Sequence, residues 1–274
     1  MKTQELEHDE VRTRVREQYG KVASKDAGYG CAPTCCGTST EDAGPGRGAD
    51  AVSQGLGYSA EQTGAVPDGA NLGLGCGNPQ AIAALQTGET VLDLGSGAGF
   101  DSFLAARAVG AAGRVIGVDM TPEMVSKARK NQAAGGYSNV EFRLGEIESL
   151  PVANGSVDAI ISNCVINLSP DRRRVFREAF RVLKTGGRLA ISDVVALAEI
   201  PEPLRKDWEL YTGCVAGAST ADELKAWLAQ AEFTQIRIEP KDGSREIIRG
   251  WFPGRKIEEF LGSATIEAVK PERH

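Results

Sequence analysis

Unbroken apolar runs alternate with amphipathic stretches from about residue 80 onward. Five of these runs are rich in Val and Ile and have the length of a strand: 89–95, 114–120, 140–146, 157–163 and 187–195. Stretches with the helical spacing of apolar residues follow the first, second and fourth runs, at 101–109, 122–134 and 170–183. Strands that are apolar throughout are expected where helices cover both faces of a sheet. The alternation therefore predicts an α/β fold with a parallel, doubly wound sheet.

The chain on either side of this region has different patterns. After Pro201 we expect helices at 203–214, 220–231 and near 245–252, and strands at 234–240 and 263–271, which would complete a seven-stranded, mostly parallel Rossmann-like sheet. Near the N-terminus, the apolar spacing predicts a helix over 4–26. Residues 27–70 are dominated by Gly, Ala, Ser, Thr and Asp without a period, so we expect a long loop.

These patterns divide the chain of 274 residues into three regions. We expect an N-terminal helix and cysteine-containing segment at 1–70, a Rossmann-like, ligand-binding domain at 71–200, and a C-terminal α+β region at 201–274. That length suffices for one large α/β domain with additions.

Composition excludes several classes of partner. The net charge is −6, and an acidic chain is poorly suited to nucleic acid, because phosphate binding needs a basic face. The charged N-terminus is no secretory signal, and the sequence has no apolar run of the roughly 18 residues that a membrane span needs. We therefore expect a cytoplasmic protein, in which the six cysteines are reduced thiols rather than a disulfide framework.

The strongest local motif is VLDLGSGAGFD at 91–101, in which a strand ends near Asp93 and a helix begins after three glycines. Gly95, Gly97 and Gly99 allow a tight turn and the close approach of a ligand. A dinucleotide fingerprint would require glycine at position 100, where this chain has Phe. The spacing thus disfavours a bound pyrophosphate, and a tight turn without any ligand is the plain alternative.

The motif resembles the first motif of class I methyltransferases, where the methionine part of S-adenosylmethionine is held. Asp119 ends the second strand, where a carboxylate can accept hydrogen bonds from both ribose hydroxyls. Met120 would lie beside the adenine. By the same resemblance, Glu146 and Ile147 would contact the adenine, and Asn163 would lie beside the methionine carboxylate and the sulfonium.

Three cysteines lie next to expected strand ends or turns on the ligand-binding side. They are Cys76 in NLGLGCGNP, Cys164 in ISNCVINLSPD and Cys214 in YTGCVAGA. Each alone could be a small, buried packing residue. Together, over about residues 67–271, the three segments resemble arsenite S-adenosylmethionine methyltransferases. That resemblance implies that these cysteines are the catalytic ligands of trivalent arsenic, and that region 201–274 contributes to arsenic binding.

The chemistry implied by this resemblance is consistent with the rest of the chain. Trivalent arsenic is a soft centre that prefers thiolates, and three thiolates leave its lone pair free to attack a methyl group. Such a nucleophile needs no base to remove a proton, and the two histidines, His8 and His274, lie at the chain ends. The resemblance further implies that a Cys76–Cys164 disulfide returns two electrons to arsenic, and that glutathione or thioredoxin reduces it.

Cys31, Cys35 and Cys36 form a second group of thiols in the segment expected to be a loop. They are either solvent-exposed reactive thiols or auxiliary ones that capture arsenic or resolve the catalytic disulfide. A zinc site is disfavoured, because no fourth ligand lies nearby in the sequence.

Two other functions stay open at this point. One is a class I methyltransferase of a small organic acceptor, such as a quinone or sterol precursor, in which Cys76, Cys164 and Cys214 only pack. The other is a metalloid-binding protein without catalysis, against which the intact glycine motif and Asp119 argue. In each case we expect a small-molecule ligand, no nucleic acid, no membrane and, by resemblance, a monomer.

Overall fold

The computed structural model describes residues 2–24 and 47–272. Cys31, Cys35, Cys36 and His274, for which the sequence made predictions, lie outside the described residues.

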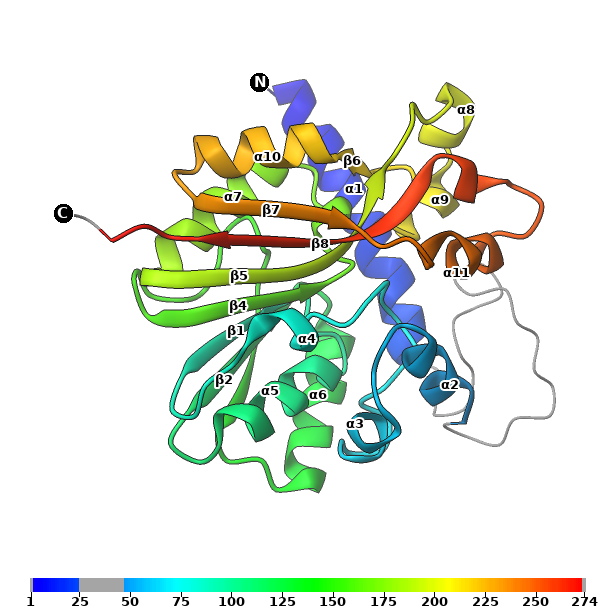
Figure 1. Ribbon diagram of the computed structural model, residues 1–274. Coiled ribbons are helices and arrows are strands. Elements are labelled where there is room, and N and C mark those ends of the chain that lie inside the picture. Colours follow the sequence, from blue (N-terminus) through cyan, green and yellow to red (C-terminus); the bar gives the residue numbers. More distant parts are fainter. Residues whose placement is uncertain (1, 25–46, 273–274) are drawn as a thin grey trace.

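The centre of the molecule is one mixed β-sheet in the order β3-β2-β1-β4-β5-β8-β7 (Figure 1). All neighbours are parallel except β8, which runs antiparallel to both β5 and β7. The strands are β1 Thr90–Leu94, β2 Arg114–Asp119, β3 Val140–Leu144, β4 Val157–Asn163, β5 Leu183–Ala196, β7 Thr234–Pro240 and β8 Leu261–Val269. The doubly wound, mostly parallel sheet expected from the alternating pattern is confirmed.

An eighth strand corrects the predicted count of seven. It is β6 Ser219–Thr220, which pairs in parallel with the end of β5. Two polar residues give no hydrophobic run, so the pattern of the sequence could not reveal this strand. It nevertheless holds the chain that follows Cys214 against the end of β5.

Helices cover both faces of the sheet (Figure 1). One face packs against α4 Gln80–Ala83, α5 Phe100–Val109 and α6 Pro122–Gly135, and the other against α7 Arg172–Val182 and α10 Ala221–Gln230. Phe103 of α5 is fully buried in the first layer and Phe176 of α7 in the second. Because helices cover both faces, β1 and β4 are buried along almost their whole length.

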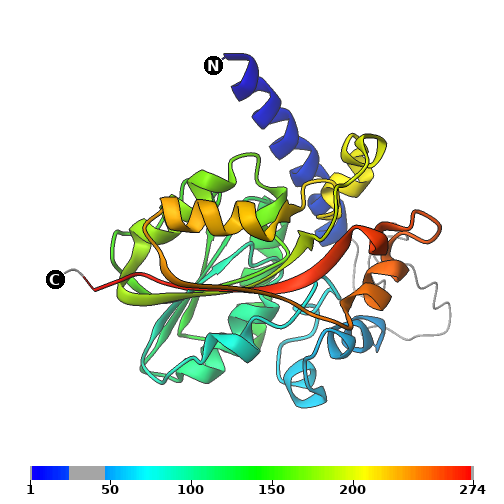
Figure 2. The ribbon, with the colours of Figure 1, turned by 45° about the horizontal axis from the view of Figure 1, so that its top comes forward.

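The remaining helices gather at the end of the sheet toward which the parallel strands run (Figures 1 and 2). The longest, α1 Lys2–Ser24, packs against α6, α9 and the turn η1. The others are α2 Arg47–Gly55, α3 Ala60–Gly64, η1 Ile166–Leu168, α8 Glu202–Arg205, α9 Trp208–Thr212, α11 Ser244–Trp251 and η2 Ile257–Glu259. Ligands of open α/β sheets bind at this end.

Two predicted elements differ from the structure. The loop expected over 27–70 contains α2 and α3 in its described part, and α3 begins with a capping box between Ser59 and Gln62. The single helix expected at 203–214 is two short helices, because the Asp207 carboxylate caps a new start at α9. Within 2–24 and 47–272, no helix combines the length and the apolar character needed to cross a membrane.

Candidate active site

The glycine motif forms one wall of a deep cavity at the carboxyl ends of β1 and β2. Gly95, Gly97 and Gly99 all have positive φ, at 67°, 52° and 100°. A side chain at Gly95 would overlap Val165, whereas a Cβ at Gly97 would meet no atom within 4 Å. The loop is therefore packed tightly at Gly95 and open toward the cavity at Gly97.

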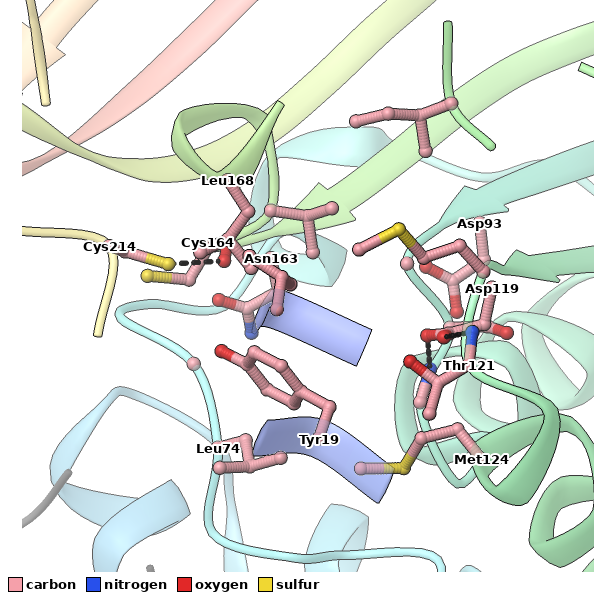
Figure 3. Close-up of a pocket in the computed structure, with 18 of the residues that line it drawn as sticks. Tyr19, Leu74, Asp93, Asp119, Thr121, Met124, Asn163, Cys164, Leu168 and Cys214 are labelled. Atoms are coloured by element: carbon pink, nitrogen blue, oxygen red, sulfur yellow. Dashed lines mark hydrogen bonds between the residues drawn. The ribbon is translucent and has the colours of Figure 1, made fainter. Parts of the chain in front are cut away.

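Asp119 holds the glycine loop against the end of β2. Its carboxylate accepts hydrogen bonds from the backbone N–H of Gly97 at 2.9 Å and of Thr121 at 2.8 Å, as the dashed lines in Figure 3 show. Burial raises the pKa of this carboxyl. Met120 and Ile147, which the sequence predicts to lie beside the adenine, also line the cavity.

Two further buried acids, Asp93 and Asp101, line this half of the cavity. Asp93 accepts a hydrogen bond from the Ser102 hydroxyl at 2.6 Å, and Asp101 accepts one from the Tyr58 hydroxyl at 2.8 Å. Burial raises the pKa values of Asp93 and Asp101. A ligand that carries positive charge would lower these raised pKa values, so three such acids around one cavity favour a cationic ligand.

The stability of the ligand-free protein should depend on pH through Asp93. Burial and the charge of Asp101 raise the pKa of Asp93 to about 8. Between about pH 4 and pH 8 the folded chain therefore binds a proton that the unfolded chain has released, so the free energy of unfolding falls as pH rises. We expect Asp93→Asn, which cannot ionise, to flatten this fall in urea unfolding measured across that range. An equal slope in the variant and the wild type would contradict the assignment.

Helix α1 closes the cavity on a third side, through Arg12, Val15 and Tyr19. Figure 3 shows the Tyr19 ring between the thiols and the acidic half. Glu146, expected beside an adenine ring, instead places its carboxylate near Arg12 at 3.2 Å and Arg16 at 3.7 Å. Its neighbours Gly145 and Ile147 line the cavity.

The three cysteines predicted from their separate segments meet at the other end of the cavity. Cys164 and Cys214 line it, and the Cys214 thiol donates a hydrogen bond to the Cys164 carbonyl oxygen at 2.8 Å (Figure 3). Cys76 is 3% exposed and belongs to the same hydrophobic cluster as Val194 and Trp251, against which the partly buried Cys164 packs. The sulfur atoms of Cys76 and Cys164 and a carboxylate oxygen of Asp193 lie within 4.8 Å of one another.

The local backbone and charges around Cys164 are unusual. Cys164 and Cys214 have φ of 59° and 63°, a left-handed conformation that residues other than glycine rarely adopt and that often marks a functional site. Hydrogen bonds with Cys214 and Cys76, together with burial, raise the pKa of the Cys164 thiol well above its usual value. Burial raises the pKa of Asp193 to about 6.

The remaining site residue named from sequence, Asn163, lines the cavity between the acidic half and the thiols. Several other residues of the site were not singled out from sequence: Arg12, Tyr58, Asp101, Asn167 and Asp193. Asp101 is the last residue of the glycine motif, so its position offered a signal, whereas Asp193 lies inside the strand predicted at 187–195. Tyr58 lies in the segment expected to be a loop, where no pattern indicated burial.

A family model described as a methyltransferase domain matches residues 85–232. The arsenite methyltransferase of Halobacterium salinarum is 54% identical over 273 residues, which cover 97% of this chain and 68% of that protein. The arsenite methyltransferase of Aquipseudomonas alcaligenes is 46% identical over 171 residues, or 60% of this chain. The chain spans about half the length of that second relative, 49%.

A solved structure agrees with these relatives. It is an arsenic(III) S-adenosylmethionine methyltransferase from Chlamydomonas reinhardtii, with 32% sequence identity and a TM-score of 0.59. The match covers 82% of this chain and 73% of that one. The similarity therefore extends over most of the chain.

Proposed function

Because the chain belongs to the arsenite methyltransferase family of class I methyltransferases, we propose that it transfers the methyl group of S-adenosylmethionine to thiol-bound trivalent arsenic. The observation that carries the proposal is the meeting of Cys76, Cys164 and Cys214, from three distant segments, at one end of the cavity. The glycine loop and three carboxylates form the other end. Packing alone does not require three cysteines to meet beside a cavity.

The residues at the acidic end fit S-adenosylmethionine, which supplies an electrophilic methyl group when bound. The open space at Gly97 admits a ligand against the backbone, and Asp119 offers carboxylate oxygens as acceptors at the end of β2. Asp93 and Asp101 favour the positive charge of this ligand. Met120 and Ile147 provide apolar surface suited to a base. These residues position the donor with its reactive end toward the thiols.

The thiols would hold the acceptor. Three cysteine thiols displace three hydroxyl groups of arsenous acid as three water molecules, so each thiol proton leaves with a hydroxyl. No separate base is then needed, which agrees with a Cys164 thiol whose raised pKa keeps it protonated. Holding donor and acceptor in line can supply on the order of 7–11 kcal/mol of barrier reduction in the most favourable cases.

The methyl transfer raises arsenic from the trivalent to the pentavalent state. We propose that Cys76 and Cys164 form a disulfide and return two electrons to arsenic, because their sulfur atoms lie within 4.8 Å of each other. A thiol reductant, glutathione or thioredoxin, would then reduce the disulfide by exchange.

We also propose that the protein is a cytoplasmic monomer and that thioredoxin can be its partner. In this proposal, region 71–200 binds the donor and region 201–274 supplies Cys214.

Product analysis tests the proposal. The protein is incubated with arsenite, S-adenosylmethionine labelled in its methyl group, and glutathione, and the arsenic species are separated and identified. We expect labelled methylarsenicals. Labelled donor that binds but yields none would contradict the proposal, and would return attention to a small organic acceptor such as a quinone or sterol precursor. Failure to bind the donor at all would contradict the methyltransferase assignment.

A further inference from the structure

The Asn163 side chain joins the Cys76 loop to the end of β4. Its Oδ1 accepts a hydrogen bond from the Cys76 backbone N–H at 3.0 Å, and its Nδ2 donates to the Gly77 carbonyl oxygen at 2.8 Å. The same Nδ2 lies 3.0 Å from the Tyr58 hydroxyl. Gly75 has φ of 119°, and a Cβ there would lie 2.7 Å from the amide. The loop thus closes around the side chain that directly precedes Cys164.

Asn167 makes the corresponding connection on the other side of Cys164. Its Nδ2 donates to a carboxylate oxygen of Asp193 at 2.9 Å and to the Val194 carbonyl oxygen at 2.6 Å. Its Oδ1 accepts from the Ser219 N–H at 3.3 Å, in the segment that follows Cys214. A side chain at Gly217 would overlap the Asn167 carbonyl oxygen. The chain after Cys214 is thereby held close to the turn after Cys164.

Asp193 fixes the turn between these two amides. Its carboxylate also accepts from the Ile166 N–H at 2.9 Å, and the Cys164 N–H donates to the Ser192 carbonyl oxygen at 2.8 Å. These bonds hold the segment 163–167 to the end of β5. Cys164 is therefore the fixed member of the thiol group. Asn163 ties the Cys76 loop to its segment, and Asn167 ties the chain after Cys214 to it, in addition to the direct bond from the Cys214 thiol to the Cys164 carbonyl oxygen.

We propose that Asn163 and Asn167 are positioning residues that set the distances from Cys164 to Cys76 and from Cys164 to Cys214, respectively. The inference rests on the proposed function, but one of its two tests, the oxidation of thiol pairs, does not depend on arsenic. Asn167 is 1% exposed and lies outside the cavity lining, so it acts through the thiols rather than on a ligand. Asn163 lines the cavity, yet its oxygen and nitrogen are both engaged by the Cys76 loop. Each amide should therefore affect one thiol and not the other.

Double-mutant cycles for arsenite binding test this selectivity, with Cys31, Cys35 and Cys36 replaced by serine throughout. We expect Asn163→Ala to weaken arsenite binding roughly tenfold when Cys76 is present and less than about twofold in a Cys76→Ser background. Asn167→Ala should show the same dependence on Cys214. The crossed pair, Asn163→Ala with Cys214→Ser, should be additive. An equal loss in the presence and absence of the matching cysteine would overturn the inference.

A control separates positioning from a general loss of stability. Asn139 donates through its amide to the carbonyl oxygens of Ala106 and Gly110, on the face of the sheet that carries α5. Asn139→Ala removes a similar pair of bonds, so it should lower the unfolding midpoint by a similar amount without changing arsenite binding. If Asn167→Ala does not fold, Asn167→Ser, which keeps one hydroxyl, takes its place in the cycle.

A measurement without arsenic keeps this inference distinguishable from the proposed function. Diamide oxidises two nearby thiols to a disulfide and is itself reduced to the hydrazine, and mass mapping identifies the pair. In Cys214→Ser, Asn163→Ala should slow formation of the Cys76–Cys164 bond severalfold, whereas Asn167→Ala should leave the rate unchanged. In a Cys76→Ser background, Asn167→Ala should slow formation of the Cys164–Cys214 disulfide severalfold, whereas Asn163→Ala should leave its rate unchanged. The same slowing by both asparagine variants would overturn the inference, even if the wild type methylates arsenite.

Discussion

Replacing Cys164 by serine is expected to abolish methylation of arsenite, with a loss in kcat/KM of roughly hundredfold or more. Cys164 is the thiol that neighbours both of the others, and it is also one of the two that would form the reducing disulfide. A serine hydroxyl is a hard oxygen ligand and holds soft trivalent arsenic poorly. It also cannot donate the electrons that the catalytic cycle requires. The measurement is the rate of methylarsenical formation under saturating donor.

Cofactor affinity provides the control for this variant. Serine preserves the shape of the side chain, and the bonds of Asp119 to Gly97 and Thr121 lie at the opposite end of the cavity. Calorimetric binding of S-adenosylmethionine should therefore stay within about twofold of the wild type, since surface and isosteric changes remote from a ligand have small effects. A Cys164→Ser protein that methylates arsenite at near the normal rate would remove Cys164 from the acceptor site.

Gly95→Ala should have the second largest effect, because it strains the backbone and displaces Val165 at the same time. Gly95 has φ of 67°, and an added Cβ would overlap the Val165 side chain. The left-handed conformation costs alanine about 1–2 kcal/mol, and overpacking adds about 1–3 kcal/mol. Val165 follows Cys164 directly, so its displacement should also impair arsenite binding. Chemical unfolding and arsenite titration measure the two effects.

Gly97→Ala is the matched control for this strain. Its φ of 52° is also left-handed, but no atom lies within 4 Å of the added Cβ, which points to open space. The free energy of unfolding should therefore fall by about 1–2 kcal/mol only, while binding of S-adenosylmethionine weakens. Equal destabilisation by the two substitutions would show that the contact of Gly95 with Val165 contributes nothing.

The sheet and its covering helices could be predicted because burial on both faces leaves a direct signal. The strands predicted at 157–163 and 234–240 coincide with β4 and β7, β1 is one residue shorter than predicted at each end, and β2 ends one residue earlier than predicted. Buried parallel strands need apolar residues on both faces, so their composition alone marks them. β6 gave no such signal, since two polar residues held by β5 depend on tertiary contacts.

The N-terminal half of the site was harder to predict for the same reason. Helix α2 consists of RGADAVSQG, which is rich in small residues, and it buries only a few side chains, Ala49 and Ser53 among them. The Ser59–Gln62 capping box of α3 was present in the sequence but was outweighed by the Gly- and Ala-rich composition around it. Tyr58, which lies just before that box, therefore went unnoticed although it donates to Asp101.

Site residues were found where a motif marks them and missed where only the fold brings them together. Cys76, Cys164 and Cys214 were named because each belongs to a short recognisable segment. Asn167 lies in the same segment as Cys164, but its partner Asp193 lies 26 residues away. No spacing within one sequence indicates that two such groups bond to each other. Only the hydrogen bonds of the folded chain connect Asn167 and Asp193 with the segments that carry Cys164 and Cys214.

The most direct test of the account is the coordination of arsenic itself. The measurement is arsenic K-edge X-ray absorption on the arsenite complex of a variant with Cys31, Cys35 and Cys36 replaced by serine. The account predicts a first shell of three sulfur atoms, which loses one sulfur in Cys76→Ser, in Cys164→Ser and in Cys214→Ser. A first shell of oxygen atoms, or one that all three serine variants leave unchanged, would contradict the claim that these thiols hold the methyl acceptor.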